Sequence, residues 1–141
     1  MPTSIFIRAM HPKTEIRPEA KAIATDIDDI AIKVSEENAA INGIKLGHGP
    51  GQLLLAVADG MEHPLIAARA PYDLLIANIL AGPLIELAPS FAASVAPGGS
   101  VILAGLLDTQ ADAVIAAYQA EGMTLVEGGN GEWRVLVLEK A

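Results

Sequence analysis

Three polar side chains stand directly after short apolar runs, and their types could recognise a ligand. They are Asp26 after residues 22–25, Asp59 after residues 53–58, and Asn78 after residues 74–77. Uninterrupted apolar runs of this length are typical of strands buried on both faces of a parallel sheet. The carboxyl ends of such strands meet at one edge, where open α/β sheets bind their ligands. We therefore expect two carboxylates and an amide to face a common crevice.

This combination of groups suits a nucleoside-like ligand. A carboxylate at the end of the strand before a helix, here Asp26, can accept hydrogen bonds from both hydroxyls of a ribose. Asp59, one strand away, could accept from an exocyclic amine, and Ile27 could pack on the face of a base. Local roles remain open for the same residues: a strand end for Asp26, an ordinary turn for Asp59, and a bond to its own loop backbone for Asn78.

Other candidate sites are weaker. His11, His48 and His63 lie apart and lack metal-ligand spacing, and the chain has no cysteine, so no metal site is predicted. The glycine-rich residues 47–51 lack both the Lys and the strand-then-helix context of a phosphate-binding loop, and we interpret them as a turn.

Composition narrows the class of protein. The chain has 141 residues, of which 52% are hydrophobic and 18% charged, which predicts one compact globular domain. A formal charge of -8, with nine Lys and Arg spread thinly, argues against direct binding of nucleic acid. The apolar runs are too short to span a bilayer and no signal layout begins the chain, so we expect a cytoplasmic protein with no membrane partner.

The polar residues must be positioned by alternating strands and helices. Asp28 is expected to cap a helix that ends at Asn42-Gly43, with Ile30, Val34 and Ile41 near one face. Further elements are expected as a helix over residues 83–95 ended by residues 97–99, a strand over 100–104, a helix capped by Asp108 that runs through Glu121, and a hairpin of residues 123–126 and 133–138. This order predicts a Rossmann-like, mostly parallel sheet with helices on both faces and a C-terminal antiparallel β-hairpin.

Five segments carry a resemblance to a known family: ATDID, ENAAING, YDLLIANILAGPLIELAP, APGGSVILAGLL and the hairpin segment GEWRVLVL. Together they resemble the ribosomal protein L11 methyltransferases, which are class I S-adenosylmethionine-dependent enzymes. The resemblance covers roughly residues 20–141, and NILAGPL is its most specific part.

The resemblance implies a role for each candidate residue. Asp26 would hold the ribose hydroxyls of S-adenosylmethionine, Ile27 would lie against the adenine, and Asp59 would lie near the adenine amine. Residues 78–80, Asn78, Ile79 and Leu80, would form the active site next to the methyl group and the incoming amine. The family methylates lysine side chains and an N-terminal amine of a large-subunit ribosomal protein. Methylation of planar amides or bases is less favoured, because no aromatic side chain follows Asn78 closely.

The chain also departs from the family. It has no glycine before Gly43, whereas the family carries a glycine-rich loop after its first strand. We therefore expect a truncated catalytic domain over residues 21–141, behind an unmatched leader over residues 1–20. In this hypothesis residues 4–8 fill the position of the missing first strand and residues 10–21 form a shortened crossover. If that position stayed open, a second copy could fill it in a homodimer.

Three functions remain open from the sequence. The first is a protein amine methyltransferase, whose activity in this chain is doubtful because the glycine-rich loop is missing. The second is a remnant that binds the nucleoside or S-adenosylmethionine without catalysis. The third is an inert, self-associating domain.

Overall fold

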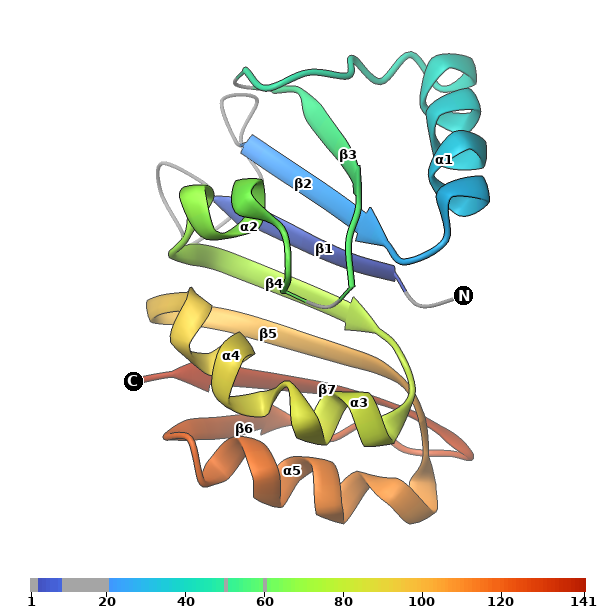
Figure 1. The fold of residues 1–141 in the computed structure, drawn as a ribbon. Coiled ribbons are helices and arrows are strands. Elements are labelled where there is room, and N and C mark those ends of the chain that lie inside the picture. The colour runs from blue at the N-terminus through green and yellow to red at the C-terminus, as the bar shows by residue number, and fades with distance from the viewer. Residues whose placement is uncertain (1–2, 9–20, 50, 60) are drawn as a thin grey trace.

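The computed structural model describes residues 3–8, 21–49, 51–59 and 61–141 and contains one seven-stranded sheet with helices packed on it (Figure 1). The strands are β1 (Thr3–Arg8), β2 (Lys21–Asp26), β3 (Leu53–Val57), β4 (Tyr72–Asn78), β5 (Val95–Leu107), β6 (Met123–Glu127) and β7 (Trp133–Lys140). The helices are α1 (Asp29–Ile41), α2 (Pro64–Arg69), α3 (Ala81–Glu86), α4 (Ala88–Ser94), the 3-10 turn η1 (Asp108–Gln110) and α5 (Ala111–Gln119).

The strand order across the sheet is β3-β2-β1-β4-β5-β7-β6. Strands β2 and β3 are parallel, as are β4 and β5, whereas β1 and β7 run against their neighbours. The predicted Rossmann-like α/β fold with a C-terminal hairpin is confirmed. The helix α2 was not predicted from the sequence.

The helices cover both faces because the crossovers run in opposite directions. The chain moves outward from β2 through α1 to β3, and the other way from β4 through α3 and α4 to β5. Right-handed crossovers in opposite directions place their helices on opposite faces of a sheet. Strands β4, β5 and β7 contribute buried side chains to the main core, where these pack with Phe91 of α4 and Tyr118 of α5. The buried strand residues include Leu75, Val101, Leu103, Leu136 and Leu138.

Strand β1 lies between β2 and β4 and is antiparallel to both. Its residues Ile5 and Ile7 pair with Ala24 and Ala22 of β2, and Arg8 pairs with Lys21. A crossover would have made this pair parallel, so β1 runs opposite to the direction that the expected crossover implies. Of the residues 10–21 expected to form that crossover, 10–20 lie outside the described residues, and Lys21 is the first residue of β2. Because β1 occupies this position, an open position no longer provides a reason for a dimer.

Helix α1 begins as predicted but presents a different face to the sheet. The Asp28 carboxylate accepts from the Ile30 N–H at 2.9 Å, and Gly43 adopts a positive φ of 70° just after the helix. The buried residues of α1 are Ile32 and Ala39, whereas Ile30 is 65% exposed. Val34 and Ile41 are exposed too, because they share the face of Ile30.

The expected helix over residues 83–95 is two helices, α3 and α4, which meet at Leu87. Pro89 lacks an N–H and cannot donate to the carbonyl four residues earlier, which accounts for a break at this place. The Tyr118 hydroxyl donates to the Leu84 carbonyl at 2.8 Å and so ties α5 to α3 next to the break.

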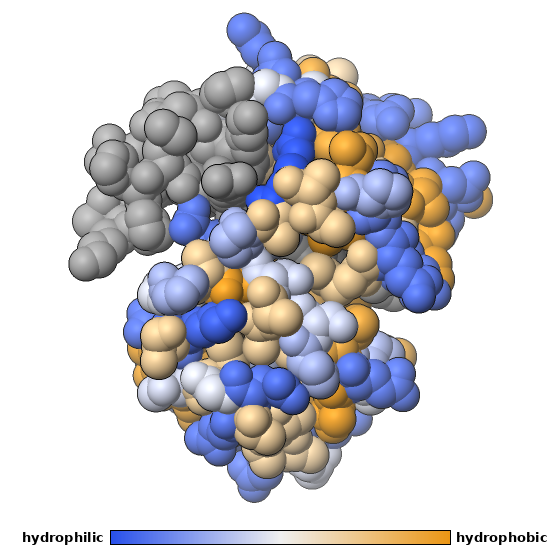
Figure 2. Space-filling view, turned by 60° about the vertical axis from the view of Figure 1, so that its left-hand side comes forward, coloured by the Kyte–Doolittle hydropathy of each residue, from blue (hydrophilic) through white to orange (hydrophobic). Residues whose placement is uncertain are grey.

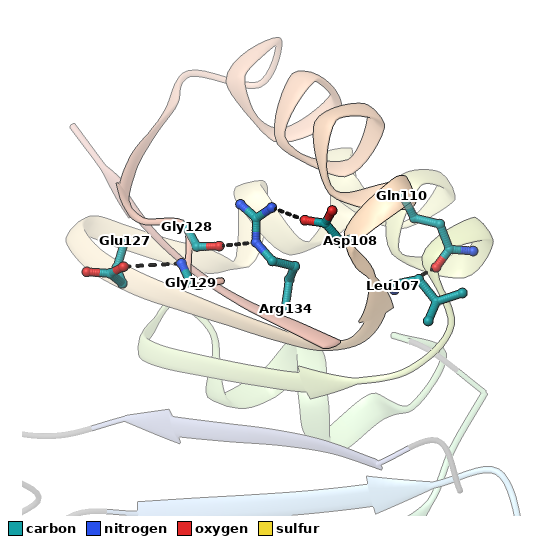
Figure 3. Close-up of polar contacts among 7 residues, drawn as sticks. All are labelled: Leu107, Asp108, Gln110, Glu127, Gly128, Gly129 and Arg134. Atoms are coloured by element: carbon teal, nitrogen blue, oxygen red, sulfur yellow. Dashed lines mark hydrogen bonds and ion pairs between the residues drawn. The ribbon is translucent and has the colours of Figure 1, made fainter. Parts of the chain in front are cut away.

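The prediction that Asp108 caps the last helix is wrong. Asp108 begins η1, and its carboxylate forms an ion pair with Arg134 of β7 at 2.6 Å (Figure 3). The Gln110 side chain accepts instead from the Leu107 N–H at 2.9 Å. The Arg134 guanidinium also donates to the Gly128 carbonyl, so it joins the end of β5 to the turn of the hairpin.

Candidate functional site: a pocket at the carboxyl ends of β2, β3 and β4

The end of β2 is the most tightly organised part of the site. Asp26 is only 4% exposed, and its carboxylate accepts from the Asp28 N–H at 3.0 Å. The Ala58 N–H, just beyond β3, donates to the Asp26 carbonyl at 3.0 Å. These bonds turn the chain sharply from β2 into α1 and hold the Asp26 backbone against the end of β3.

A pocket of about 450 Å³ opens beside this turn. The lining comes from the ends of β2 and β3, the turn before α2, the loop after β4, and the helices α3 and α4 with the residue between them. The lining residues are Thr25, Asp26, Ile27, Ala58, Asp59, Met61, Glu62, Ile79, Leu80, Pro83, Glu86, Leu87 and Ser90. The pocket therefore lies at the edge where open α/β sheets bind ligands. Its size and mostly apolar lining, with a few polar groups, are those of a small-molecule site.

The structure brings five of the six predicted site residues together. Asp26, Ile27, Asp59, Ile79 and Leu80 all line the pocket. Asp26 is buried in the wall, whereas Ile27 is 55% and Leu80 71% exposed, so these two apolar side chains lie at an open part of it.

Asn78 is the exception. It is exposed and does not line the pocket, although it ends the same strand from which Ile79 and Leu80 follow. Its side-chain oxygen lies beside Gly105 of β5, since a Cβ at Gly105 would be 2.7 Å from the Asn78 Oδ1. The Ile79 carbonyl would be equally close, so β5 approaches the turn after β4 as nearly as a glycine allows.

Several lining residues were missed in the sequence analysis. Glu86 and Ser90 follow Pro83 by three and seven positions, a spacing that would place all three on one side of the single helix expected from the sequence. Because the expected helix comes directly after Ile79 and Leu80, the sequence could have predicted that Glu86 and Ser90 line the same pocket. Glu62 had no such signal, because it belongs to an irregular turn held by its N–H bond to the Asp59 carbonyl at 3.0 Å.

The ionisable groups among the described lining residues are all acidic. Asp26, Asp59, Glu62 and Glu86 are among the lining residues, and none of the thirteen is Lys, Arg or His. Neighbouring carboxylates repel an anion and attract a cation. Within the described residues, His, Asp and Glu do not gather in threes to form a metal-binding group. In that part of the chain no helix is long and apolar enough to cross a membrane.

Comparison with known proteins points to one family. The family model described as ribosomal protein L11 methyltransferase (PrmA) matches residues 18–141. A protein of Brucella suis with the name ribosomal protein L11 methyltransferase is 54% identical over 102 residues, which cover 72% of this chain and 34% of that protein. The protein of that name in Mesorhizobium japonicum is 48% identical over 96 residues, which cover 68% of this chain and 31% of that protein. The chain thus spans about one third of the length of the curated relatives that it matches.

Solved structures give the same fold. The ribosomal protein L11 methylase of Lactobacillus delbrueckii subsp. bulgaricus superposes with a TM-score of 0.71 at 27% identity, over 84% of this chain and 57% of that one. A methyltransferase of Pyrococcus furiosus superposes with a TM-score of 0.61 at 17% identity, over 84% of this chain and 62% of that one, and this similarity concerns the fold alone.

Proposed function

The chain belongs to the ribosomal protein L11 methyltransferase family, and we propose that its pocket binds the nucleoside end of S-adenosylmethionine. S-adenosylmethionine supplies an activated methyl group for transfer to an amine when it is bound. The observation that carries the proposal is the buried Asp26 carboxylate in the wall of a pocket at the carboxyl end of β2. A carboxylate at the end of a strand that leads into a helix is suited to accept from ribose hydroxyls.

The other lining residues support the same orientation of the nucleoside. Ile27 offers an apolar surface for the adenine, and Asp59 an acceptor for its amine. In this proposal Ile79 and Leu80 border the 5′ end of the nucleoside. Asn78 does not line the pocket, and its proposed place beside the methyl group rests on the resemblance of the NILAGPL segment. β1 precedes the matched residues, and we propose that it stands in for the family's first strand.

The substrate in this proposal is an amine of a large-subunit ribosomal protein, and the location is the cytoplasm, where such proteins are made. The resemblance of the NILAGPL segment supports the amine, because Ile79 and Leu80 provide no aromatic surface for a planar substrate. Methyl transfer by the chain alone is expected to be very weak, because the described lining of the pocket includes no cationic group for the carboxylate at the methionine end of the cofactor.

Calorimetric titration with S-adenosylhomocysteine, the product form of the cofactor, tests the pocket. We expect a Kd below about 100 μM, which corresponds to about -5.5 kcal/mol. Asp26→Asn keeps an acceptor for the Asp28 N–H but loses the charge, and should weaken binding about tenfold or more. The matched control is Asp28→Asn, which makes the same charge change two residues away, can still cap α1, and does not line the pocket.

Equal affinity of the two variants would contradict the role of Asp26. If Asp26→Asn did not fold, Ile27→Ser would provide a second test, since Ile27 is an exposed residue of the pocket. No heat at ligand concentrations of about 1 mM would reject the nucleoside pocket, because Kd would then exceed any useful affinity.

A further inference from the structure

The direction of β1 decides which of its two ends lies at the pocket. Thr3 lies opposite both Asp26 and Asn78, so the beginning of β1, and not its end, is at the pocket edge of the sheet. Arg8 lies opposite Lys21, at the other edge. In nucleotide-binding α/β sheets, the turn and helix that follow the first strand present backbone N–H groups to the anionic part of the ligand. Here β1 ends at Arg8, at the edge of the sheet opposite to the pocket.

Among the described residues, no Lys, Arg or His side chain lines the pocket in place of those donors. Arg69 and Lys140 donate to backbone carbonyls at the opposite edge, near the first residues of β2 and β5. Arg134 lies at the same edge as the pocket, but its guanidinium is bound to Asp108 and to a carbonyl of the hairpin turn (Figure 3). The described lining of the pocket therefore contains carboxylates and no cationic side chain that could bind the α-carboxylate of an amino acid.

Glu86 is the carboxylate best placed to act on the 5′ end of a nucleoside. It lies on α3, which begins directly after Ile79 and Leu80, whereas Glu62 follows the turn at Asp59 on the adenine side of the proposed site. The structure gives the Glu86 side chain no hydrogen bond or ion pair with any described residue, so its charge is available to a ligand.

We infer that this pocket selects adenosine derivatives whose 5′ substituent carries no carboxylate, and that it prefers a cationic substituent, which Glu86 attracts. This inference rests on the proposed nucleoside site and changes what that site recognises: the nucleoside provides the affinity, and the amino-acid half of S-adenosylhomocysteine adds none. The fit of the pocket to the nucleoside is inferred from the buried Asp26. Its misfit to the amino-acid carboxylate is inferred separately, from the direction of β1 and the acidic residues of the lining.

Three ligands that share adenosine and differ at the 5′ position test the inference. They are 5′-amino-5′-deoxyadenosine, which is a cation near neutral pH, 5′-methylthioadenosine, which is neutral, and S-adenosylhomocysteine, a zwitterion that carries the α-carboxylate together with an α-ammonium group. Calorimetry at low salt should give the cation about three- to fivefold tighter binding than the neutral ligand, as expected for an ion pair with an exposed carboxylate. S-adenosylhomocysteine should bind no tighter than methylthioadenosine.

The variant Glu86→Gln should bring the affinity ratio of the cationic and neutral ligands to within about twofold of one, because it removes the attracting charge. The control is Glu121→Gln, which makes the same charge change after α5 and away from the pocket, and should keep the ratio. Binding of S-adenosylhomocysteine at least threefold tighter than methylthioadenosine would overturn the inference and leave the proposed function intact. A ratio that Glu86→Gln does not change would overturn the role of Glu86. Failure of all three ligands to bind would reject the nucleoside pocket itself.

Discussion

Replacement of Gly105 by alanine tests how β5 positions the turn that carries the proposed site. Gly105 has a φ of 85° and lies where the pairing of β5 with β7 shifts register between Leu103 and Leu106. An alanine there meets two costs. The first is the positive φ, which costs an L-residue about 1–2 kcal/mol. The second is a Cβ placed 2.7 Å from the Ile79 carbonyl oxygen, which is backbone and must move.

Gly98 separates these two costs. It also lies in β5 and has a φ of 81°, but a Cβ there would meet nothing within 4 Å. Gly98→Ala should therefore cost only the conformational strain, about 1–2 kcal/mol of the free energy of unfolding. Gly105→Ala should cost a further 1–3 kcal/mol or so, the usual effect of forcing an extra group into a packed site.

Urea unfolding followed by circular dichroism measures both losses, and ligand titration adds a second measurement. Because Ile79 lines the pocket, displacement of its backbone should also weaken binding of methylthioadenosine in Gly105→Ala more than in Gly98→Ala. A chain that folds with Gly98→Ala and fails to fold with Gly105→Ala would agree with this reasoning. Losses that agree within about 0.5 kcal/mol, together with equal affinities, would refute it.

Three further predictions concern stability. Tyr118→Phe should lower the free energy of unfolding by about 1–3 kcal/mol, because the Leu84 carbonyl loses its buried donor. Burial raises the pKa of Tyr72 to about 12 and that of Tyr118 as well, so both phenols keep their protons in the folded chain at a pH where the unfolded chain loses them. The free energy of unfolding should therefore not depend on these groups below pH of about 10, and should fall as the pH rises through about 12. The fall should be less steep in Tyr118→Phe, and unfolding curves at several pH values would detect this difference. Ile32→Ala should cost about 2–4 kcal/mol in a urea titration, whereas Ile30→Ala, on the exposed face of α1, should stay within about 0.5 kcal/mol; equal losses would mean that the two faces of α1 are assigned the wrong way round.

Much of the fold could be predicted from local patterns. The apolar run before Asn78, the Asp28 cap with Gly43 after α1, and the glycine turn between β6 and β7 all depend on neighbouring residues, and the structure confirms each of them. The family could be recognised for the same reason, since NILAGPL is a continuous segment.

Other features depend on contacts between distant residues. The exposed position of Ile30 and the burial of Ile32 depend on where α1 meets β2 and β3, and the α1 segment carries apolar residues on both sides. Asp108 had the residue type of a helix cap, but Arg134, 26 positions away, competes for its carboxylate. Nothing within either segment identifies such a partner.

The sequence by itself determined the residues that end β2, β3 and β4 and the order of the elements, because both follow from local hydrophobic patterning and turn chemistry. It therefore predicted five of the residues that now line one pocket. Only the tertiary structure decided the direction of β1 and the meeting of Glu62 and Glu86 with Asp26 and Asp59 in a pocket whose described lining includes no cation. A strand has the same side-chain alternation in either direction, so its pattern cannot specify the direction. The charge balance of a pocket arises where segments distant in sequence converge, and that convergence exists only in the folded chain.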